Sequence, residues 1–505
     1  MYKYFKTCVF LFFFEPLLVS CAGMPRSGNR LVSFVPVQYR ELDFSTENPV
    51  KNLSVAQMMQ DIGTLEYVFK TGYVFYDRME QEHIFDFEKA FARMRKECRE
   101  SEEMTYGQFQ IVIAKDLSGI PDRHIGFMRA DGVYSNFTPR RYFFSTGIQV
   151  RKTDEGSLSA VNSIGTIVQT GWKVYASEKQ LFPVYSSAGN EFLVGTLAVT
   201  KPDEIDVCVE NSEGRKSIQK LTPREWYTTY MNSTYKIENG SQVFYRICSF
   251  EPYSENGQKD ALEAFAQSGK DEQDKDIIVI DLRANTGGDC SYSLRFLSGL
   301  TNRCLYLPEG GKEQEEDYIS CGYTTLFSPA VLQAEKYAMK AKYVPVSENC
   351  DSGMLDRIIS YSREKPEKYF LISSQYSPEE LVMPSSCNSF KGKIILIVNC
   401  WTASACDSFY RELRPYKNTI VVGENTQGLI SSVDPLRYVL PNSKAVVVIP
   451  CGTSNWSREK DFEYDPEDGL LPDYWVENDV QLCETLRGFG VDEKLIAGIH
   501  TAPAR

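Results

Sequence analysis

Ser404 is the residue whose type and surroundings are best suited to chemistry. It lies in a turn of mostly small residues, 401–407, directly after the apolar run 393–399. This pattern predicts a buried strand that ends in a tight turn, with a helix running from Ala405 to Arg414. Such geometry places a serine hydroxyl at a helix N-terminus, where nucleophilic serines often lie. Serine is also a favoured N-cap residue, so this segment alone leaves a purely structural capping role open.

A second chemical signal is the loop 280–288, which follows another buried strand. Gly287 and Gly288 permit positive φ angles and let backbone N–H groups approach a ligand closely. Such groups can stabilise an oxyanion, and we expect Asp281 and Arg283 to orient the loop by pairing with each other. Taken alone, a glycine pair after a strand is more often an ordinary turn. Two further segments, 423–428 after another strand and 468–473 near the end of the chain, are weak signals by themselves.

Taken in order, these segments resemble the C-terminal processing, or tail-specific, serine peptidases. That family has an Asp-Leu-Arg-x-Asn-x-Gly-Gly loop, a small-residue serine turn, Gly-Glu-x-Thr-x-Gly and a Gly-x-x-Pro-Asp terminus. The matching residues here are 281–288, 403–407, 423–428 and 469–473. The resemblance covers residues 240–475 and extends more loosely to residues 55–235. It implies an α/β catalytic domain with a ClpP/crotonase-like mixed sheet and helices, preceded by a helical N-terminal part and a degenerate PDZ-like β module.

The resemblance also bears on which residue serves as the base. One bacterial branch pairs its serine with a lysine one residue beyond the Gly428 equivalent, and Leu429 occupies that position here. A second branch, similar to the tricorn core and the chlamydial protease-like activity factor, uses a histidine, in part from an Asp-x-His segment. Asp122-Arg123-His124 matches that segment, whereas the position of tricorn's own histidine holds Arg246. The resemblance therefore predicts His124 as the base.

Histidine is scarce, which narrows the alternatives to His124. We expect His83 to be structural because it lies in a predicted amphipathic helix, and His500 lies near the end of the chain. The His-dependent branch also uses a carboxylate somewhat before the Gly-x-x-Pro-Asp terminus. Glu467 and Glu463 both lie in that region, and the sequence does not choose between them.

The chemistry predicted from these residues is peptide hydrolysis through an acyl-enzyme. Neutral His124 would accept the Ser404 proton, and an acidic neighbour would hold the imidazole tautomer. The N–H groups of Ala405 and of Gly287 or Gly288 would stabilise the oxyanion. No metal or organic cofactor is expected, and the substrate would be a protein or peptide. The alternative is a catalytically inactive surface lipoprotein that binds a peptide or ligand on the same scaffold.

The composition excludes some other classes of function. The chain has 505 residues and a formal net charge of −13, without a long cluster of lysine and arginine, which makes nucleic-acid binding improbable. Its 14 cysteines form no Cys-x-x-Cys pair, so a zinc ribbon or thioredoxin-type motif is absent from the sequence.

The N-terminus has the pattern of an export signal. Lys3 and Lys6 precede the apolar run 8–14, and the whole stretch is too short and interrupted for a comfortable transmembrane helix. The segment 18–21 resembles the bacterial lipobox, which implies lipidation of Cys21 and a membrane attachment through the lipid. We therefore expect a lipoprotein of the cell envelope, with a secreted protein as the second choice.

The sequence divides into six predicted parts. They are a signal with lipobox (1–21), a tether (22–50), a helical domain (51–130), the PDZ-like β module (131–238), the catalytic domain (239–480, with an insert at about 290–390) and a C-terminal tail (481–505). Two amphipathic helices are predicted from the helical spacing of Met58, Ile62, Leu65 and Phe69 and of Ile84, Phe87, Phe91 and Met94.

Overall fold

The chain folds into two compact units that are each discontinuous in sequence. The structure is a computed structural model, and it describes residues 30–128, 134–226, 233–252, 258–301, 322–340, 352–374, 390–414, 416–454 and 464–499. The first unit comprises Met1–Pro139, Glu313–Glu379 and Ile430–Asp465, and the second comprises Arg140–Lys312, Glu380–Leu429 and Pro466–Arg505. Part of the predicted insert thus belongs to the same unit as the N-terminal helices, which the linear division of the sequence did not anticipate.

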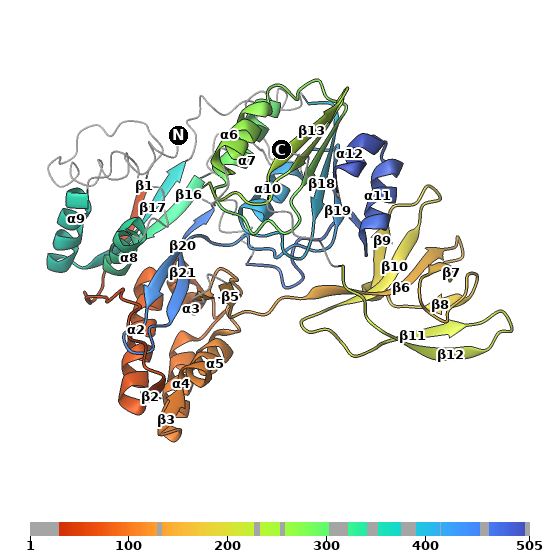
Figure 1. The fold of residues 1–505 in the computed structure, drawn as a ribbon. Coiled ribbons are helices and arrows are strands. Elements are labelled where there is room, and N and C mark those ends of the chain that lie inside the picture. The colour runs from red at the N-terminus through yellow and green to blue at the C-terminus, as the bar shows by residue number, and fades with distance from the viewer. Residues whose placement is uncertain are drawn as a thin grey trace. The chain divides into compact units, whose positions relative to one another are not determined.

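Helices form the N-terminal part of the first unit (Figure 1). They are α2 (Val55–Gly72), α3 (Tyr76–Gln81), α4 (Phe87–Glu100) and α5 (Tyr106–Leu117). The four apolar residues that predicted α2, from Met58 to Phe69, are all fully buried. The prediction for α4 holds from Phe87 onwards, but Ile84 lies before the N-cap Asp86 and is exposed.

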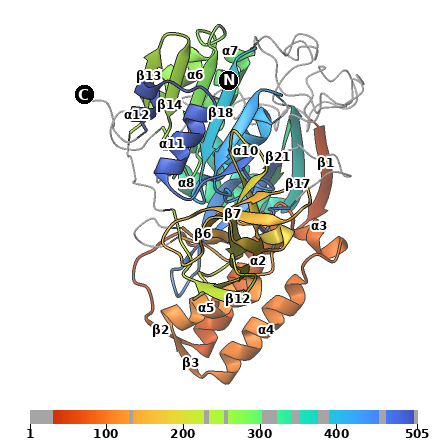
Figure 2. The same ribbon diagram turned by 90° about the vertical axis from the view of Figure 1, so that its right-hand side faces the viewer.

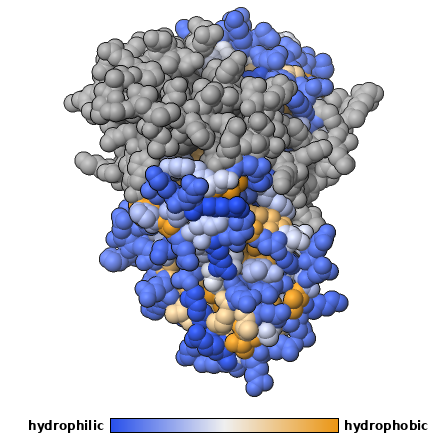
Figure 3. All heavy atoms as spheres, turned by 90° about the vertical axis from the view of Figure 1, so that its left-hand side faces the viewer, coloured by the Kyte–Doolittle hydropathy of each residue, from blue (hydrophilic) through white to orange (hydrophobic). Residues whose placement is uncertain are grey.

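An antiparallel sheet of seven strands completes the first unit. The strands have the order β1-β17-β16-β21-β4-β5, and β20 also pairs with β21. The strands are β1 (Arg30–Pro36), β4 (Gly126–Met128), β5 (Tyr134–Asn136), β16 (Gly322–Phe327), β17 (Glu367–Ser374), β20 (Val433–Val439) and β21 (Val446–Ser454). The remaining elements are α8 (Pro329–Lys340), α9 (Ser352–Glu364) and the short pair β2 (Asn52–Ser54) and β3 (Glu103–Thr105). On the face drawn in Figure 3, apolar residues lie in small groups among mostly hydrophilic ones, as is usual for protein surfaces.

The core of the second unit is a six-stranded sheet with helices on both faces (Figures 1 and 2). Its strands are β13 (Tyr235–Asn239), β14 (Gln242–Arg246), β15 (Ile277–Asp281), β18 (Lys393–Val398), β19 (Thr419–Gly423) and β22 (Tyr474–Trp475), in that order. All neighbours are parallel except β13 and β14. The central strands β15 and β18 are apolar except for Asp281 at the end of β15 and Lys393 at the start of β18, as expected for strands whose two faces are both buried.

Alternate side chains of these strands pack against two different groups of helices. Ile278 and Ile280 face a core shared with α6 (Gln258–Ser268), α7 (Ser291–Leu300) and α10 (Ala405–Leu413). Ile277 and Val279 face a core shared with α11 (Asp479–Gly488) and α12 (Glu493–Ala497). The predicted α/β catalytic sheet is therefore present, with the strands β15 and β18 and the helix α10 close to the predicted positions.

The second unit also contains the predicted β-rich module, which is one seven-stranded antiparallel sheet of order β12-β11-β8-β7-β6-β10-β9. The strands are β6 (Tyr142–Lys152), β7 (Leu158–Ser163), β8 (Lys173–Tyr175), β9 (Leu181–Val184), β10 (Glu191–Ala198), β11 (Ile205–Glu210) and β12 (Lys216–Leu221). Residues 140–226, all of which are described, contain no α-helix and only one 3-10 turn, η1 (Glu178–Gln180). The likeness of this module to a PDZ domain stays a prediction.

The membrane predictions concern residues that the structure does not describe. Cys21 and the rest of the signal lie outside the described residues. None of the described helices has both the length and the apolar character needed to cross a bilayer.

Candidate active site

Three loops of the second unit start at the same edge of its parallel sheet. They follow the neighbouring strands β15, β18 and β19, and the carboxyl edge of parallel strands is where α/β proteins usually place their sites. The loops are also bonded to one another. The Ala403 N–H donates to the Asn285 carbonyl at 3.0 Å, and the Gln427 N–H donates to the Thr402 carbonyl at 2.8 Å.

Ser404 occupies a backbone conformation that helix capping does not require. Its φ and ψ angles are 56° and −114°, whereas an ordinary N-cap residue has an extended backbone. Ser54 and Thr105, which cap α2 and α5, show the ordinary case with φ of −68° and −64°. A non-glycine residue in this region is strained by roughly 1–3 kcal/mol. Ser404 does begin α10, but the strained elbow is the geometry expected of an exposed nucleophile.

Close packing and one carboxylate hold this elbow in place. The Ser404 N–H donates to Asp407 Oδ2 at 2.9 Å, and the Leu429 N–H donates to the same oxygen at 2.8 Å. Gly287, with a φ of +100°, lies against the elbow, because a Cβ at that position would come within 2.8 Å of the Ser404 Cβ. Leu429, at the position where the lysine branch has its base, is therefore linked to the elbow by the shared acceptor Asp407. Its side chain is apolar and buried.

The backbone N–H groups around Ser404 differ in whether they already have a hydrogen-bond acceptor. The Gly287 N–H donates to Asn285 Oδ1 at 2.9 Å, so it is not available to an oxyanion. The N–H groups of Gly288 and Ala405 have no acceptor among the described residues. Of the three predicted oxyanion donors, Gly288 and Ala405 therefore fit the role, while Gly287 provides the close approach.

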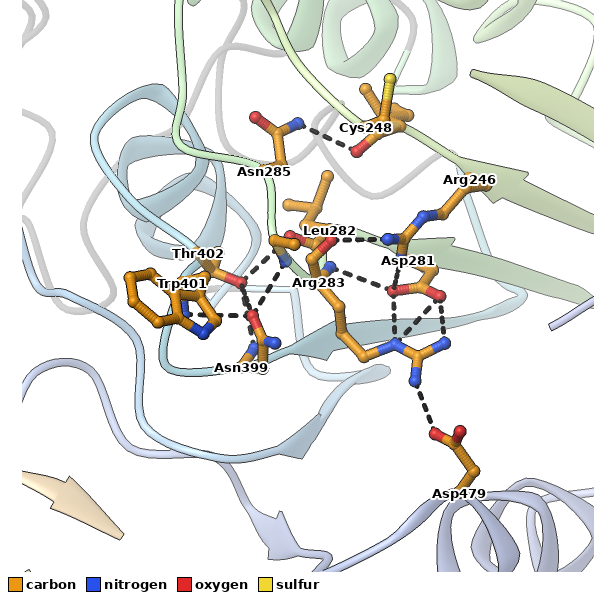
Figure 4. A network of polar contacts seen from close by, with 12 residues as sticks. Arg246, Cys248, Asp281, Leu282, Arg283, Asn285, Asn399, Trp401, Thr402 and Asp479 are labelled. Carbon is orange, nitrogen blue, oxygen red and sulfur yellow. Dashed lines mark hydrogen bonds and ion pairs between the residues drawn. The ribbon is translucent and has the colours of Figure 1, made fainter. Parts of the chain in front are cut away.

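A buried ionic network supports the loop after β15 (Figure 4). Asp281 Oδ1 lies 2.6 Å from Arg246 Nη1, and Asp281 Oδ2 lies 2.7 Å from Arg283 Nη2. Arg246 also donates to the Arg283 carbonyl, and Arg283 reaches Asp479 Oδ1 at 2.8 Å. Burial acts to raise the pKa of Asp281, but the two guanidinium groups outweigh it and hold that pKa below its ordinary value. The predicted pairing of Asp281 with Arg283 is confirmed, and Arg246 is a second partner that the sequence did not indicate.

Two buried asparagines fix the ends of the loops (Figure 4). Asn285 Nδ2 donates to the Ile247 carbonyl at 3.0 Å, and Asn399 Oδ1 accepts from the N–H groups of Ala284 and Trp401 at 2.9 and 3.1 Å. The role of Asn399 was not predicted, although a polar residue that ends an apolar strand is a recognisable signal.

His124 belongs to the first unit, where it is buried in a cluster of polar groups. Its backbone N–H donates to Asp122 Oδ1 at 2.9 Å. The Ser432 hydroxyl donates to the same oxygen at 2.8 Å and lies 3.1 Å from His124 Nδ1. When Asp122 is ionised, the hydroxyl proton is directed at it, and the serine oxygen can then accept from a protonated Nδ1. This tautomer leaves Nε2 unprotonated, so Nε2 is the nitrogen able to accept a proton.

A second carboxylate, Asp465, lies in the same cluster. Its Oδ2 accepts from the Arg123 N–H at 2.6 Å, and its Oδ1 accepts from the N–H groups of Ile430 and Ser431, both at 2.9 Å. Burial, with the nearby charge of Asp465, raises the pKa of Asp122 to about 7. Burial lowers the pKa of His124, although the charge of Asp465 opposes this shift.

Neither of the two predicted acidic residues, Glu463 and Glu467, is among the described residues of the His124 cluster. Glu463 lies outside the described residues. Glu467 belongs to the second unit, is 61% exposed and pairs with Arg141 at 2.9 Å. Asp465, which lies between the two in sequence, was missed, although its position in that interval was the available signal. Of the other histidines, His83 follows the end of α3 with a φ of 56° and is exposed, and His500 lies outside the described residues.

One atom from each of Asp122, His124 and Asp465 lies within 4.8 Å of the others, which is close enough for a metal ion. The carboxylate oxygens, however, already accept hydrogen bonds from backbone N–H groups and from the hydroxyls of Tyr73, Ser431 and Ser432. Those donor hydrogens point to where a cation would have to bind. The cluster is better suited to holding a proton than to holding a metal.

A comparison with protein families identifies the stretch of the chain that carries these loops. The sequence model of peptidase family S41 matches residues 244–474. Residues 244–474 are a peptidase family S41 domain. The S41 domain thus spans the loops that carry Ser404, Gly288 and Asp281, and the family predicted from the order of the motifs is confirmed.

Three solved structures align with most of this chain at low sequence identity. Mature CPAF is 13% identical, with 88% of this chain and 98% of that chain covered and a TM-score of 0.43. The photosystem II D1 C-terminal processing protease is 12% identical, with 88% and 98% covered and a TM-score of 0.34. The tricorn protease is 12% identical, with 88% of this chain and 37% of that chain covered and a TM-score of 0.35. A comparison of the sequence with curated proteins finds no significant match.

The ionic network predicts a large loss of stability when its central charge is removed. Asp281→Asn leaves the buried Arg246 without a counter-charge, and breaking a buried pair in this way costs roughly 3–5 kcal/mol. Urea unfolding of the purified protein at pH 7 measures this loss. Because the pKa of Asp281 is lowered in the fold, its contribution is complete above the unfolded pKa of about 4 and is lost as the pH falls through the folded value.

Asp479→Asn is the matched control for this measurement. Asp479 pairs with Arg283 but is 30% exposed, so its replacement should cost at most about 1 kcal/mol. Equal losses in the two variants would contradict the central role of Asp281.

Proposed function

We propose that the protein is an exported serine endopeptidase in which Ser404 is the nucleophile and His124 is the base. The observation that carries this proposal is the strained elbow at Ser404, beside the unused N–H groups of Ala405 and Gly288. A capping serine needs neither feature, whereas an acyl-transfer nucleophile needs both. The S41 domain supports peptide bonds as the target of this chemistry.

The pairing of Ser404 with His124 rests on the match of Asp122-Arg123-His124 to the Asp-x-His segment of the His-dependent branch. Within the second unit, Asp407 accepts from the N–H groups of Ser404 and Leu429. Within the first unit, Ile430 donates to Asp465, whose charge acts on His124. Each proposed catalytic residue is thus held in place inside its own unit.

The proposed reaction uses His124 Nε2 twice. Nε2 accepts the Ser404 proton as Oγ attacks the scissile carbonyl carbon, and the oxyanion forms opposite the N–H groups of Gly288 and Ala405. The imidazolium then gives its proton to the departing amine as the C–N bond breaks. Water, deprotonated by the same nitrogen, attacks the resulting ester and releases the acid, which restores the serine.

Ser432 and Asp122 are proposed to orient the imidazole. The path from Nδ1–H to the Ser432 oxygen and from the Ser432 hydroxyl to Asp122 fixes the tautomer and stabilises the imidazolium. Asp465 holds the turn at residues 430–431 and adds negative charge. We assign the acidic role to Asp122 rather than to Glu467, since Glu467 is already paired with Arg141.

Localisation in the cell envelope through lipidated Cys21 is part of the proposal, with secretion as the second choice. It rests on the basic and apolar N-terminal pattern and on the lipobox-like segment 18–21. Proteins or peptides outside the cytoplasm would then be the substrates.

Ser404 should react with a fluorophosphonate probe. The processed wild type should be labelled, Ser404→Ala should not be labelled, and His124→Ala should be labelled more slowly by about 10²-fold or more, because a positioned base contributes about 10²–10⁴-fold. In-gel fluorescence measures the rates. His83→Ala is the matched control and should behave as the wild type, because His83 is exposed and outside the polar cluster. Failure of the folded wild type to react would favour a binding protein on the same scaffold.

The rate of this labelling should depend on pH through the His124 cluster. Activity should rise with pH as His124 loses its proton and Asp122, with a pKa of about 7, ionises. Asp465→Asn removes the charge that raises the pKa values of both His124 and Asp122. The rise in labelling rate should therefore occur at lower pH, whichever of the two groups controls the rate. A rise that stays at the same pH, or moves to higher pH, would show that Asp465 does not act on the reacting base.

Ser432→Ala should lower kcat with little change in KM. The hydroxyl is buried and contacts His124 and Asp122, so its loss should affect the tautomer and cost about 10- to 100-fold of the base's contribution. Ser432→Thr keeps the hydroxyl and should recover much of the rate. Steady-state cleavage of a fluorogenic peptide measures both constants, and an equal loss in the two variants would indicate a packing effect instead.

A further inference from the structure

Trp401 is exposed in the same loop as Ser404. Its side chain is 43% accessible, although tryptophan is on average highly buried in folded proteins. It lies three residues before Ser404, so the two Cα atoms are at most about 11 Å apart. An extended peptide advances about 3.3 Å per residue. Side chains within about three residues of a bond held at Ser404 are therefore able to reach the indole ring.

The indole ring is held in place by its neighbours. The backbone N–H of Trp401 donates to Asn399 Oδ1, which also accepts from the Ala284 N–H in the loop after β15. These bonds fix the backbone that carries the ring. The Arg140 guanidinium carbon lies 5.1 Å from the centroid of the indole ring and 4.2 Å from that of the Tyr142 ring. Arg140 also donates to the Cys400 carbonyl. A ring that is fixed before binding loses little entropy when a ligand packs on it.

The charge beneath the ring indicates which ligands it accepts. Arg140 is buried, and none of the described acidic residues forms an ion pair with it. The charge of Arg140 acts on Glu424, but burial outweighs it and raises the pKa of Glu424 to about 8, which favours the neutral form of this acid at pH 7. Since Arg140 already interacts with the π system, a second cation at the ring would be repelled. Apolar side chains, which gain contact area without this repulsion, are favoured.

We propose that Trp401 is a specificity-determining residue that binds an apolar side chain, aromatic in preference to aliphatic, of the peptide substrate. Arg140 supports the ring and disfavours lysine and arginine at the same position. The inference rests on the proposed function, because it takes the peptide to be held at Ser404. It adds a substrate class that neither the S41 domain nor the Ser404 elbow specifies.

Pairs of fluorogenic peptides measure this preference. The two peptides of a pair differ only in carrying Phe or Lys at one position, and one pair is made for each of the three positions on either side of the cleaved bond. The wild type should favour Phe by about tenfold or more in kcat/KM at one position, in the range that a hydrophobic pocket provides. Trp401→Ala should reduce the Phe-to-Lys ratio at that position by most of this factor. Trp401→Phe, which keeps an aromatic ring, should retain more of it, and Arg140→Gln should improve cleavage of the Lys peptide.

The fluorophosphonate probe carries no peptide side chain and reports whether Ser404 is still assembled in each variant. A labelled Trp401→Ala protein with an unchanged ratio would overturn the inference and leave the proposed function standing. Lack of labelling of the wild type would overturn both. If Trp401→Ala does not fold, binding of the Phe peptide to Ser404→Ala decides the matter. Binding should quench tryptophan fluorescence in Ser404→Ala and should not do so when Trp401→Phe is added, and quenching that persists in the double variant would overturn the inference.

Discussion

The strained backbone of Ser404 is the constraint on which the loops at the carboxyl edge of the S41 domain's sheet depend. Its positive φ angle is sustained only because the surrounding groups over-determine it. Gly287 is a glycine because any side chain would collide with the elbow, and Asp407 holds the elbow's N–H from the first turn of α10. Beneath them, Asp281 fixes the glycine loop through two guanidinium groups. Local strain at one residue is thus balanced by interactions that extend through three loops and two strands.

The environment of His124 is determined by two buried carboxylic acids rather than by backbone strain. The carboxylates of Asp122 and Asp465 are both buried, and burial together with the charge of Asp465 raises the pKa of Asp122 to about 7. Each nevertheless accepts hydrogen bonds from rigid backbone donors, so the cluster remains ordered in either state. An imidazole in this setting is uncharged but lies next to groups that can stabilise its positive form.

The features that could be predicted from the sequence are those encoded locally. The apolar runs that form β15 and β18 are buried on both sides, and the glycine pair and small-residue turn that follow them lie where the order of the motifs implied. Ile84 was grouped by its spacing with the helix that contains Phe87, but it lies before the N-cap Asp86 and is exposed. Apolar spacing does not mark the first residue of a helix, because the capping side chain determines where the helix begins.

Long-range contacts account for most of what the sequence could not show. Ser432 and His124 are 308 residues apart, and nothing in the local pattern of either indicates the other. The same holds for Arg246, which was noted only as an occupant of another protein's histidine position and is a central partner of Asp281. Glu467 was one of two candidate acids because only position along the chain was known, and position does not reveal that Arg141 already binds it.

The interleaving of the two units has a consequence for the integrity of the molecule. The chain passes from one unit to the other at 139/140, 312/313, 379/380, 429/430 and 465/466, so neither can be excised as a continuous fragment. The six-stranded sheet takes β13, β14 and β15 from before residue 300 and β18, β19 and β22 from after residue 390, and the sheet of the first unit is divided in the same way. A peptide bond severed between β15 and β18 would therefore leave two fragments interlocked by strand pairing and shared cores, and a nicked chain would behave in solution as one particle.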